Sequence, residues 1–207
     1  MSLKLYIDNT FASPYAMSAF IALTEKKLPF TLETMDLAGG QCRLPEYRDF
    51  SLTARVPALV HDDFVLTESS AIAEYLDDAF PSPEHPALLP KDARKRARAR
   101  QIQSWLRSDL LPIRTERNTE SVFFKKPVQP LSDEARACAD KLIHACEQWI
   151  DGPNLFGRWS IADTDLAMML NRLVLNGDTL PQRLRDYAAA QWQRPSMQQW
   201  LAHHQPG

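Results

Sequence analysis

The sequence predicts an α/β domain followed by an all-helical (all-α) domain. Three observations predict this division. Strand-like and helix-like patterns alternate over residues 1–77, four prolines fall among residues 80–90, and no convincing strand pattern follows. A chain of 207 residues is long enough for one large domain or two small ones. We therefore expect a first domain over residues 1–79, a stiff proline-rich linker over residues 80–90 and a helical domain over residues 91–207.

The first part of the chain alternates strands with helices. Residues 3–7 show the short apolar alternation of a strand. Ser13 and Pro14 then begin a helix, because serine is a good N-cap and the first helical turn does not need the N–H that proline lacks. The other expected elements are the rest of this helix to about residue 27, a strand over residues 29–35, a short irregular helix after residue 40, a hairpin over residues 56–66 and a helix over residues 69–77. The order is β-α-β-α-β-β-α, with a parallel first strand pair and an antiparallel last pair.

Helical periodicity dominates the second part of the chain. One long helix is expected over residues 91–114. A second helix starts at Ser132, where two acidic residues follow in the first turn and suit the helix dipole. A third starts at Ser160, with Asp163 three residues later as a variant of the capping box. Two short helices, separated near Pro195, complete the domain.

Composition and charge exclude several classes of protein. The chain has 24 Lys and Arg against 26 Asp and Glu, a net charge of −2, which argues against a dedicated binder of nucleic acid or anionic membranes. No apolar run is long enough for a transmembrane helix. Three cysteines without a CxxC pattern favour a reducing cytoplasm, and neither they nor the histidines have the spacing of a metal site. We expect no metal or other cofactor. Six cations among residues 91–100 are interpreted as a solvated helix face or a positive rim near an anion site, rather than as a nucleic-acid site.

Three short segments of the first domain have chemistry that suits a zwitterionic ligand. Ser13 offers a hydroxyl and unpaired backbone N–H groups at a helix start. A cis bond between Val56 and Pro57 would turn the neighbouring backbone toward a ligand. Glu68 can accept from an ammonium group and Ser69 can bind a carboxylate, so this pair fits an amino-acid head group. Taken singly, each segment also fits an ordinary helix start or strand entry.

Together these segments resemble the glutathione S-transferase superfamily. The matching motifs are Ser-Pro-Tyr at 13–15, Arg-Val-Pro-Ala-Leu at 55–59 and Leu-Thr-Glu-Ser-Ser-Ala-Ile-Ala-Glu-Tyr-Leu at 66–76. Residues 154–157 and 159–166 look like the capping-box segment of that family's helical domain. The resemblance covers nearly the whole chain and is closest to bacterial serine- or cysteine-type members. It implies a thioredoxin-like first domain and a helical-bundle second domain.

The resemblance implies a binding mode for glutathione along the edge of the first domain. The main chain of Val56 would pair with the cysteinyl residue of glutathione, with Pro57 in the cis form. Glu68 and Ser69 would bind the γ-glutamyl head. The ends of the tripeptide are assigned to three more residues: Arg55 and Arg43 for the glycyl carboxylate, and Asp109 for the γ-glutamyl ammonium.

Ser13 is the catalytic residue that the resemblance implies. Some members of the family have cysteine at this place and form a mixed disulfide with glutathione, which serine cannot do. The serine hydroxyl would instead donate a hydrogen bond to the sulfur and lower the pKa of the thiol from its usual value of about 8.5. Thr10 is a candidate helper, whereas Ser18 lies too deep in the helix. The thiolate then attacks an electrophilic small molecule or an organic hydroperoxide.

The resemblance leaves the acceptor substrate open. Its pocket is expected between the two domains, covered by the loop over residues 115–130. The candidate lining residues are Phe11, Tyr15, Trp105, Phe123 and Phe124. Membership of the family further implies a cytoplasmic homodimer that acts in detoxification or oxidative stress. The alternative is a protein of the same fold that binds partners and has no catalytic activity.

Overall fold

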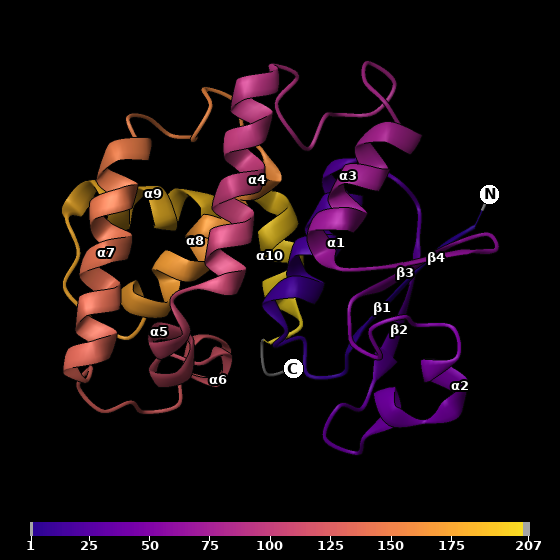
Figure 1. Ribbon diagram of the computed structural model, residues 1–207, viewed down its shortest axis with the longest axis horizontal. Helices are drawn as coiled ribbons and strands as arrows, with labels where there is room; N and C mark the ends of the chain where they lie inside the picture. The colour runs from indigo at the N-terminus through magenta and orange to yellow at the C-terminus, as the bar shows by residue number, and fades with distance from the viewer. Residues whose placement is uncertain (1, 205–207) are drawn as a thin grey trace. The chain divides into compact units, whose positions relative to one another are not determined.

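The computed structural model describes residues 2–204. It divides the chain into two compact units, Met1–Leu89 and Pro90–Gly207. The first unit holds a four-stranded sheet with helices, and the described residues of the second unit form helices and loops only (Figure 1). The predicted architecture, a thioredoxin-like α/β domain followed by an all-helical domain, is confirmed.

Four strands of the first unit form one mixed sheet in the order β2-β1-β3-β4. Strand β1 runs parallel to β2 and antiparallel to β3, and β3 runs antiparallel to β4, as predicted. The ends of β1, β2 and β4 therefore lie at the same end of the sheet as the start of β3. The strands are β1 (Leu3–Asp8), β2 (Thr31–Met35), β3 (Ala58–His61) and β4 (Phe64–Thr67).

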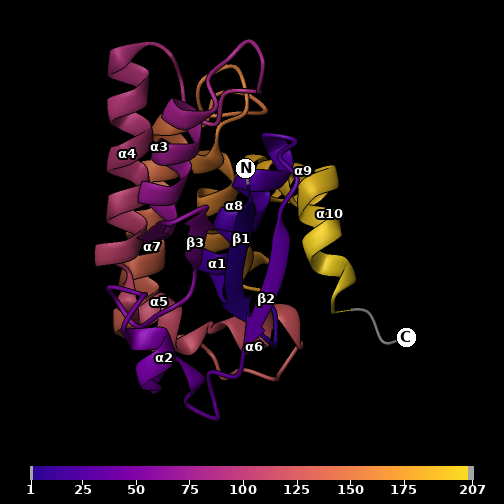
Figure 2. The same cartoon turned by 90° about the vertical axis from the view of Figure 1, so that its right-hand side faces the viewer.

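Helices cover one face of this sheet. Along β1 every second side chain is buried, including Leu5 and Ile7, because successive side chains of a strand point to opposite faces. Figure 2 shows α1 (Pro14–Glu25) and α3 (Ser69–Ala79) on the same side of the sheet. The short helices η1 (Gln41–Arg43) and α2 (Pro45–Arg48) follow β2.

The proline-rich segment is fixed to the first unit by a buried ion pair. Lys26 Nζ lies 2.7 Å from Asp77 and also donates to the carbonyl of Phe80. Both side chains are buried. The same Asp77 carboxylate accepts from the backbone N–H groups of Leu88 and Leu89, at 2.8 and 2.9 Å. The chain up to Leu89 therefore belongs to the first compact unit, although the sequence pattern ends the domain ten residues earlier.

The second unit has more helices than the sequence pattern predicts. The expected single helix over residues 91–114 is wrong, because α4 ends at Ser108 and α5 begins at Leu111. Leu110 between them has a φ of 60°, and Pro112 has no N–H with which to continue the first helix. The helices are α4 (Ala93–Ser108), α5 (Leu111–Glu116), α6 (Thr119–Phe123), α7 (Asp133–Trp149), α8 (Ile161–Val174), α9 (Gln182–Trp192) and α10 (Pro195–Ala202). Over residues 2–204, no helix is both long and apolar enough to cross a lipid bilayer.

Helix α8 forms the centre of the second unit and packs against α4 and α9. The predicted capping box opens it. The Asp163 carboxylate accepts from the backbone N–H and the hydroxyl of Ser160, at 2.8 and 2.9 Å. It also accepts from the N–H of Leu155 at 2.7 Å and from the hydroxyl of Tyr187 at 2.8 Å. Burial raises the pKa of Asp163, and these four donors oppose that effect.

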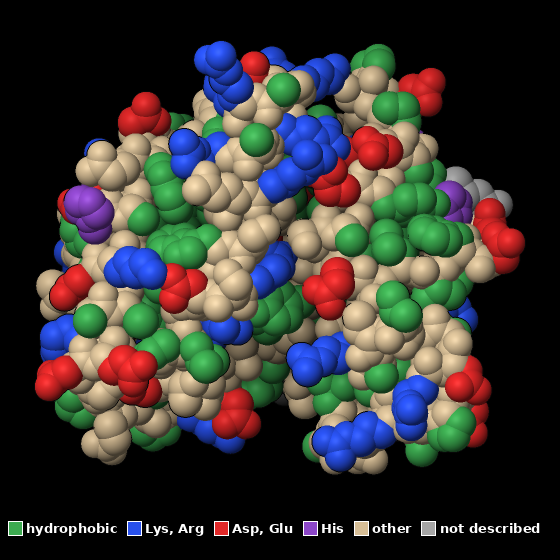
Figure 3. Space-filling view, in the orientation of Figure 1, with side chains coloured by type: hydrophobic (Ala, Val, Ile, Leu, Met, Phe, Trp, Pro, Cys, Tyr) green, Lys and Arg blue, Asp and Glu red, His purple; other side chains and the backbone are tan. Residues whose placement is uncertain are grey.

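The basic run predicted at the start of α4 lies on the surface. Arg94, Lys95, Arg98 and Arg100 are exposed, and Figure 3 shows Lys and Arg side chains gathered over this end of the helix at the top of the view. This exposure fits the interpretation as a solvated helix face.

Candidate functional site

Three predicted site segments meet at one end of the sheet. Ser13 follows β1 after a short turn, Val56–Pro57 precedes β3, and Glu68 directly follows β4. The strand pairing brings the end of β1, the start of β3 and the end of β4 to the same end of the sheet. Segments that are up to fifty-five residues apart in the sequence therefore lie at the same end of three neighbouring strands, β1, β3 and β4.

Ser13 is the N-cap of α1, as predicted. Its backbone is extended (φ −73°, ψ 116°), and its hydroxyl oxygen accepts a long hydrogen bond of 3.3 Å from the N–H of Ala16. Pro14 occupies the first helical turn. A hydroxyl has two lone pairs and one hydrogen, so accepting this bond leaves the hydrogen available for donation. Because the side chain is only half-buried, a ligand can reach it.

A buried carboxylate that the sequence analysis did not single out holds this turn. Asp8, which is 2 % exposed, accepts from the backbone N–H of Ala12 at 2.6 Å and from that of Ser13 at 3.1 Å. Thr10 donates its only hydroxyl hydrogen to the same carboxylate, at 2.7 Å, so it is not arranged as a second donor to a ligand. The available signal was an aspartate directly before a turn, where short polar side chains often bind nearby backbone N–H groups.

The segment before β3 has the backbone geometry that the resemblance implies. The Val56–Pro57 peptide bond is cis. The Tyr47 hydroxyl donates to the carbonyl of Arg55 at 2.8 Å and so fixes the approach to this bond. Burial raises the pKa of Tyr47 to about 12, which keeps the phenol protonated as a donor. The side chains of Arg55 and Arg43 are both exposed.

Glu68 connects β4 to α3 in an unusual backbone conformation. Its φ of 70° and ψ of 110° lie outside the regions that non-glycine residues favour. Such strain costs about 1–3 kcal/mol and is concentrated at functional sites. The side chain of Glu68 is exposed, whereas Ser69, the first residue of α3, is buried. The conformation therefore presents a carboxylate beside the N-terminus of a helix.

Comparison with known proteins supplies the family. The model of the glutathione S-transferase N-terminal domain matches residues 12–79, and that of the C-terminal domain matches residues 92–205. The chain belongs to the glutathione S-transferase family. A crystal structure of a glutathione transferase homologue from Burkholderia, with bound glutathione, is similar to this family member. The two are 44% identical with a TM-score of 0.83, over 98% of this chain and 97% of that chain.

Two curated relatives show how far the similarity extends. Protein IN2-1 of Zea mays is 30% identical over 207 residues, which is 96% of this chain and 74% of that protein. Glutathione S-transferase theta-2 of Homo sapiens is 33% identical over 105 residues, which is 51% of this chain and 41% of that protein. The chain thus spans less than half the length of that human transferase.

Two predicted site residues of this family member, Trp105 and Asp109, bind each other within the second unit. The Asp109 carboxylate accepts from Trp105 Nε1 at 2.8 Å, from the N–H of Leu110 at 2.7 Å, and from Lys141. These donors, with Lys141 first, lower the pKa of Asp109 to about 2. The Trp105 ring packs edge-to-face on Trp149, with ring centroids 5.5 Å apart. Both predicted residues therefore have partners between α4 and α7.

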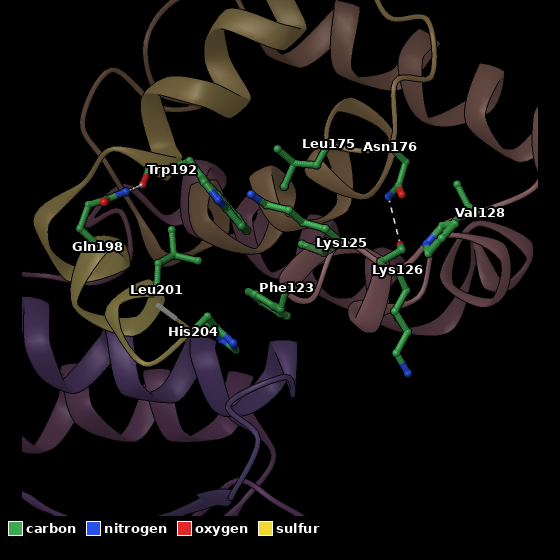
Figure 4. A pocket seen from close by; sticks show the side chains of 13 residues that line it. Phe123, Lys125, Lys126, Val128, Leu175, Asn176, Trp192, Gln198, Leu201 and His204 are labelled. Atoms are coloured by element: carbon green, nitrogen blue, oxygen red, sulfur yellow. Dashed lines mark hydrogen bonds between the residues drawn. The ribbon is translucent and has the colours of Figure 1, made fainter. Parts of the chain in front are cut away.

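The predicted acceptor-pocket residues fall into two groups. Phe11 and Tyr15 lie beside Ser13 in the first unit, whereas Trp105 and Phe123 lie in the second unit. Phe123 lines a pocket of about 700 Å³ that is formed by residues of the second unit, and Trp105 does not (Figure 4). Phe124 is 44% exposed. The structure brings Phe123 together with residues just after α8 and residues of α9 and α10 that the sequence pattern did not connect to it.

Proposed function

We propose that this chain is a glutathione transferase that binds glutathione at the sheet end described above. Family membership supports the proposal, as does the similarity to a glutathione-bound homologue over nearly the whole chain. The observation that supports it most is the position and hydrogen bonding of the Ser13 hydroxyl. Its hydroxyl lies at a helix start, keeps a hydrogen for donation, and shares one end of the sheet with Val56 and Glu68.

The binding mode uses the exposed and backbone groups at this end of the sheet. The Glu68 carboxylate receives the γ-glutamyl ammonium, and the hydroxyl of Ser69 with the first N–H groups of α3 receives the α-carboxylate. The main chain of Val56 pairs with the cysteinyl residue. The exposed guanidinium groups of Arg55 and Arg43 bind the glycyl carboxylate. We leave Asp109 out of this mode, because its carboxylate already has three donors.

The chemistry depends on making glutathione a thiolate. The thiol loses its proton to water, and the Ser13 hydroxyl stabilises the remaining anion by donating a hydrogen bond to sulfur. The positive end of the α1 dipole acts in the same direction. A pKa lowered by two units corresponds to about 2.7 kcal/mol. The thiolate then forms a bond to an electrophilic carbon, and the leaving group departs with its electron pair.

The same thiolate can also reduce an organic hydroperoxide. It attacks the outer peroxide oxygen, the O–O bond breaks, and protonation gives an alcohol and a glutathione sulfenic acid. A second glutathione then displaces water and forms glutathione disulfide. We include this reaction, a cytoplasmic location and a homodimer in the proposal as features that the family resemblance implies. Catalysis distinguishes the proposal from its alternative, a non-catalytic binding protein of this fold.

The experiment compares wild-type protein with Ser13→Ala. Calorimetry measures the glutathione Kd, and conjugation of a chlorodinitrobenzene and reduction of cumene hydroperoxide measure activity. We expect Ser13→Ala to lower kcat/KM about 100-fold while the glutathione Kd changes less than about threefold. Ser108→Ala, which removes an exposed hydroxyl from α4, serves as the matched control. An unchanged rate in Ser13→Ala would remove Ser13 from the mechanism, and a wild-type protein that binds glutathione without activity would establish the alternative.

A further inference from the structure

We propose that a pocket of the first unit, on the face of the sheet opposite α1 and α3, binds an organic ammonium compound, that is, a small apolar body with one protonated amine. Its volume of about 380 Å³ is in the range of small-molecule sites. The lining residues come from β1, the end of β2, η1 and the segment around α2 (Figure 1). Ser13, Val56 and Glu68 do not line this pocket, so the inference does not rest on the proposed function.

The strand pattern places an aromatic cluster on this face of the sheet. The side chains of Leu5 and Ile7 are buried on the face of β1 that α1 covers. Tyr6 lies between them in the sequence, so its side chain points to the opposite face. There its ring packs with those of Tyr47 and Phe50, with centroids 4.8 to 5.9 Å apart. These three rings form the aromatic wall of the pocket.

An aromatic wall suits a cationic ligand. The face of an aromatic ring has negative potential and attracts an ammonium group. Such a contact already exists in this unit, because Lys4 Nζ lies 5.8 Å from the centroid of the Tyr6 ring. The charge of Lys4 is compensated by Glu33 at 3.4 Å. The ring of Phe50 is only half-buried and is accessible to a ligand in the pocket.

The charge of the pocket also favours a cation. Among the described residues that line the pocket, Glu46 is the only charged one. Its side chain is exposed and has no ion pair within residues 2–204. Arg43 and Arg48, the nearest cations in the sequence, are exposed and do not line the pocket. A protonated amine bound against the rings would therefore meet an uncompensated carboxylate, which would repel an anionic ligand.

Hydrogen bonds hold the segments that form the pocket. The Gln41 side chain accepts from the backbone N–H of Asp36 at 2.6 Å and so fixes η1 to the end of β2. The Tyr47 hydroxyl donates to the carbonyl of Arg55 at 2.8 Å and fixes α2 to the segment before β3. Leu44, which is 51% exposed, adds apolar surface to the pocket. Because these contacts exist without a ligand, little ordering is required when one binds.

The test compares an ammonium ligand with its neutral isostere. Calorimetry with the full chain, at about pH 7 where the amine is protonated, measures the Kd of naphthylmethylammonium and of naphthylmethanol without glutathione. We expect wild-type protein to prefer the ammonium about fivefold, as for an exposed charge pair beside aromatic rings. Glu46→Gln keeps the shape of the side chain and removes the charge. The preference should therefore fall below about twofold, and the naphthylmethanol Kd should stay unchanged.

Two matched controls separate this effect from a general change of charge or structure. Asp49→Asn removes an exposed carboxylate that follows the same helix and does not line the pocket, so the preference should remain. Leu44→Ser shortens an exposed apolar side chain and should weaken the binding of both ligands about threefold. Leu52→Ser removes a leucine that is 94% exposed and does not line the pocket, so both Kd values should stay unchanged. Added salt should weaken the binding of the ammonium but not that of the alcohol.

Three results would overturn the inference. They are equal affinity of the wild type for the two ligands, no measurable binding of either ligand, and an unchanged preference in Glu46→Gln. The glutathione Kd should be the same in Glu46→Gln and in wild type. A change in that Kd would assign the carboxylate to the glutathione site and would overturn the inference as well. None of these results would affect the role proposed for Ser13, which Ser13→Ala tests separately.

Discussion

Among the helices of this chain that begin at a serine, α1 and α8 use that serine differently. At α8, Ser160 is buried and donates both its backbone N–H and its hydroxyl to Asp163. At α1, Ser13 also donates its backbone N–H to a buried aspartate, Asp8, but its hydroxyl only accepts, from Ala16 at 3.3 Å. We call the α8 cap closed, because the Ser160 hydroxyl hydrogen is donated to Asp163. We call the α1 cap open, because the Ser13 hydroxyl hydrogen remains available for donation. The same residue type thus serves stability at one helix and, in our proposal, catalysis at the other.

The position of the acidic partner produces this difference. Asp163 lies within its helix, three residues after the serine, where its carboxylate reaches the serine side chain. The equivalent position of α1 is Ala16, whose methyl side chain cannot accept a hydrogen bond. The partner of Ser13 comes instead from the preceding strand and reaches the backbone of the turn. A cap can therefore be held firmly through its N–H while its hydroxyl faces a ligand.

Removing the Asp163 carboxylate, which closes the α8 cap, should cause the largest loss of stability. Asp163→Ala leaves two backbone N–H groups and two hydroxyls without their acceptor in the core of the second unit. We expect the free energy of unfolding to fall by about 5 kcal/mol, because several buried donors lose their partner together. Urea unfolding followed by circular dichroism measures this loss. Asp165→Ala, which removes a partly buried carboxylate bound by Arg107 and Gln103, is the control for the loss of a carboxylate with fewer donors in the same helix. A loss below about 1 kcal/mol in Asp163→Ala would contradict the closed-cap interpretation.

Alkaline pH should lower the stability of the second unit, because two groups near the α8 cap, Cys146 and Tyr187, have raised pKa values. Burial raises the pKa of Cys146 to about 12, and burial together with the charge of Asp163 raises that of Tyr187 well above 10. Above about pH 9 the unfolded chain releases protons that the folded chain keeps, so the free energy of unfolding falls as the pH rises. Cys146 alone contributes a loss of up to about 4 kcal/mol by pH 12. The measurement is Tm from pH 8 to pH 11, and Cys146→Ala should show a shallower fall. An equal slope in the two proteins would exclude Cys146 as a cause.

The contrast between the caps also shows what the sequence could predict. Both helix starts follow from local chemistry within one turn: Ser13 is followed by Pro14, and Ser160 has Asp163 three residues later. The role of Asp8 was not predicted, since it holds the turn mainly through backbone N–H groups, which every residue type except proline supplies. The ion pair of Arg117 with Asp178 joins positions 61 residues apart, and only tertiary packing brings them together. For the same reason the pocket that contains Phe123 could not be assembled from sequence periodicity.

Removing the carboxylate of Asp8, at the end of β1, should lower both the stability of the chain and its activity. Asp8→Ala leaves the N–H groups of Ala12 and Ser13 without an acceptor in a half-buried part of the turn. We expect a loss of about 2–3 kcal/mol in the free energy of unfolding. Because Asp8 is a positioning residue, kcat/KM should also fall at temperatures where the variant is fully folded. Asp8→Asn keeps one acceptor and should recover part of both losses. A destabilised Asp8→Ala variant with full activity would show that the turn does not position Ser13.

Substituting the two cap serines should change the stability least, and it compares the two caps most directly. Ser160→Ala removes a hydroxyl that donates to a buried carboxylate, so the free energy of unfolding should fall by about 2 kcal/mol. Ser13→Ala removes only a weak acceptor from a half-buried start, so its loss should stay near 0.5 kcal/mol. Activity should change in the opposite order, with a large loss in Ser13→Ala and almost none in Ser160→Ala at temperatures where both are folded. Parallel urea titrations and rate measurements on the two variants provide the comparison. If Ser13→Ala proved the more destabilising substitution, its hydroxyl would serve the fold, and the distinction between an open and a closed cap would fail.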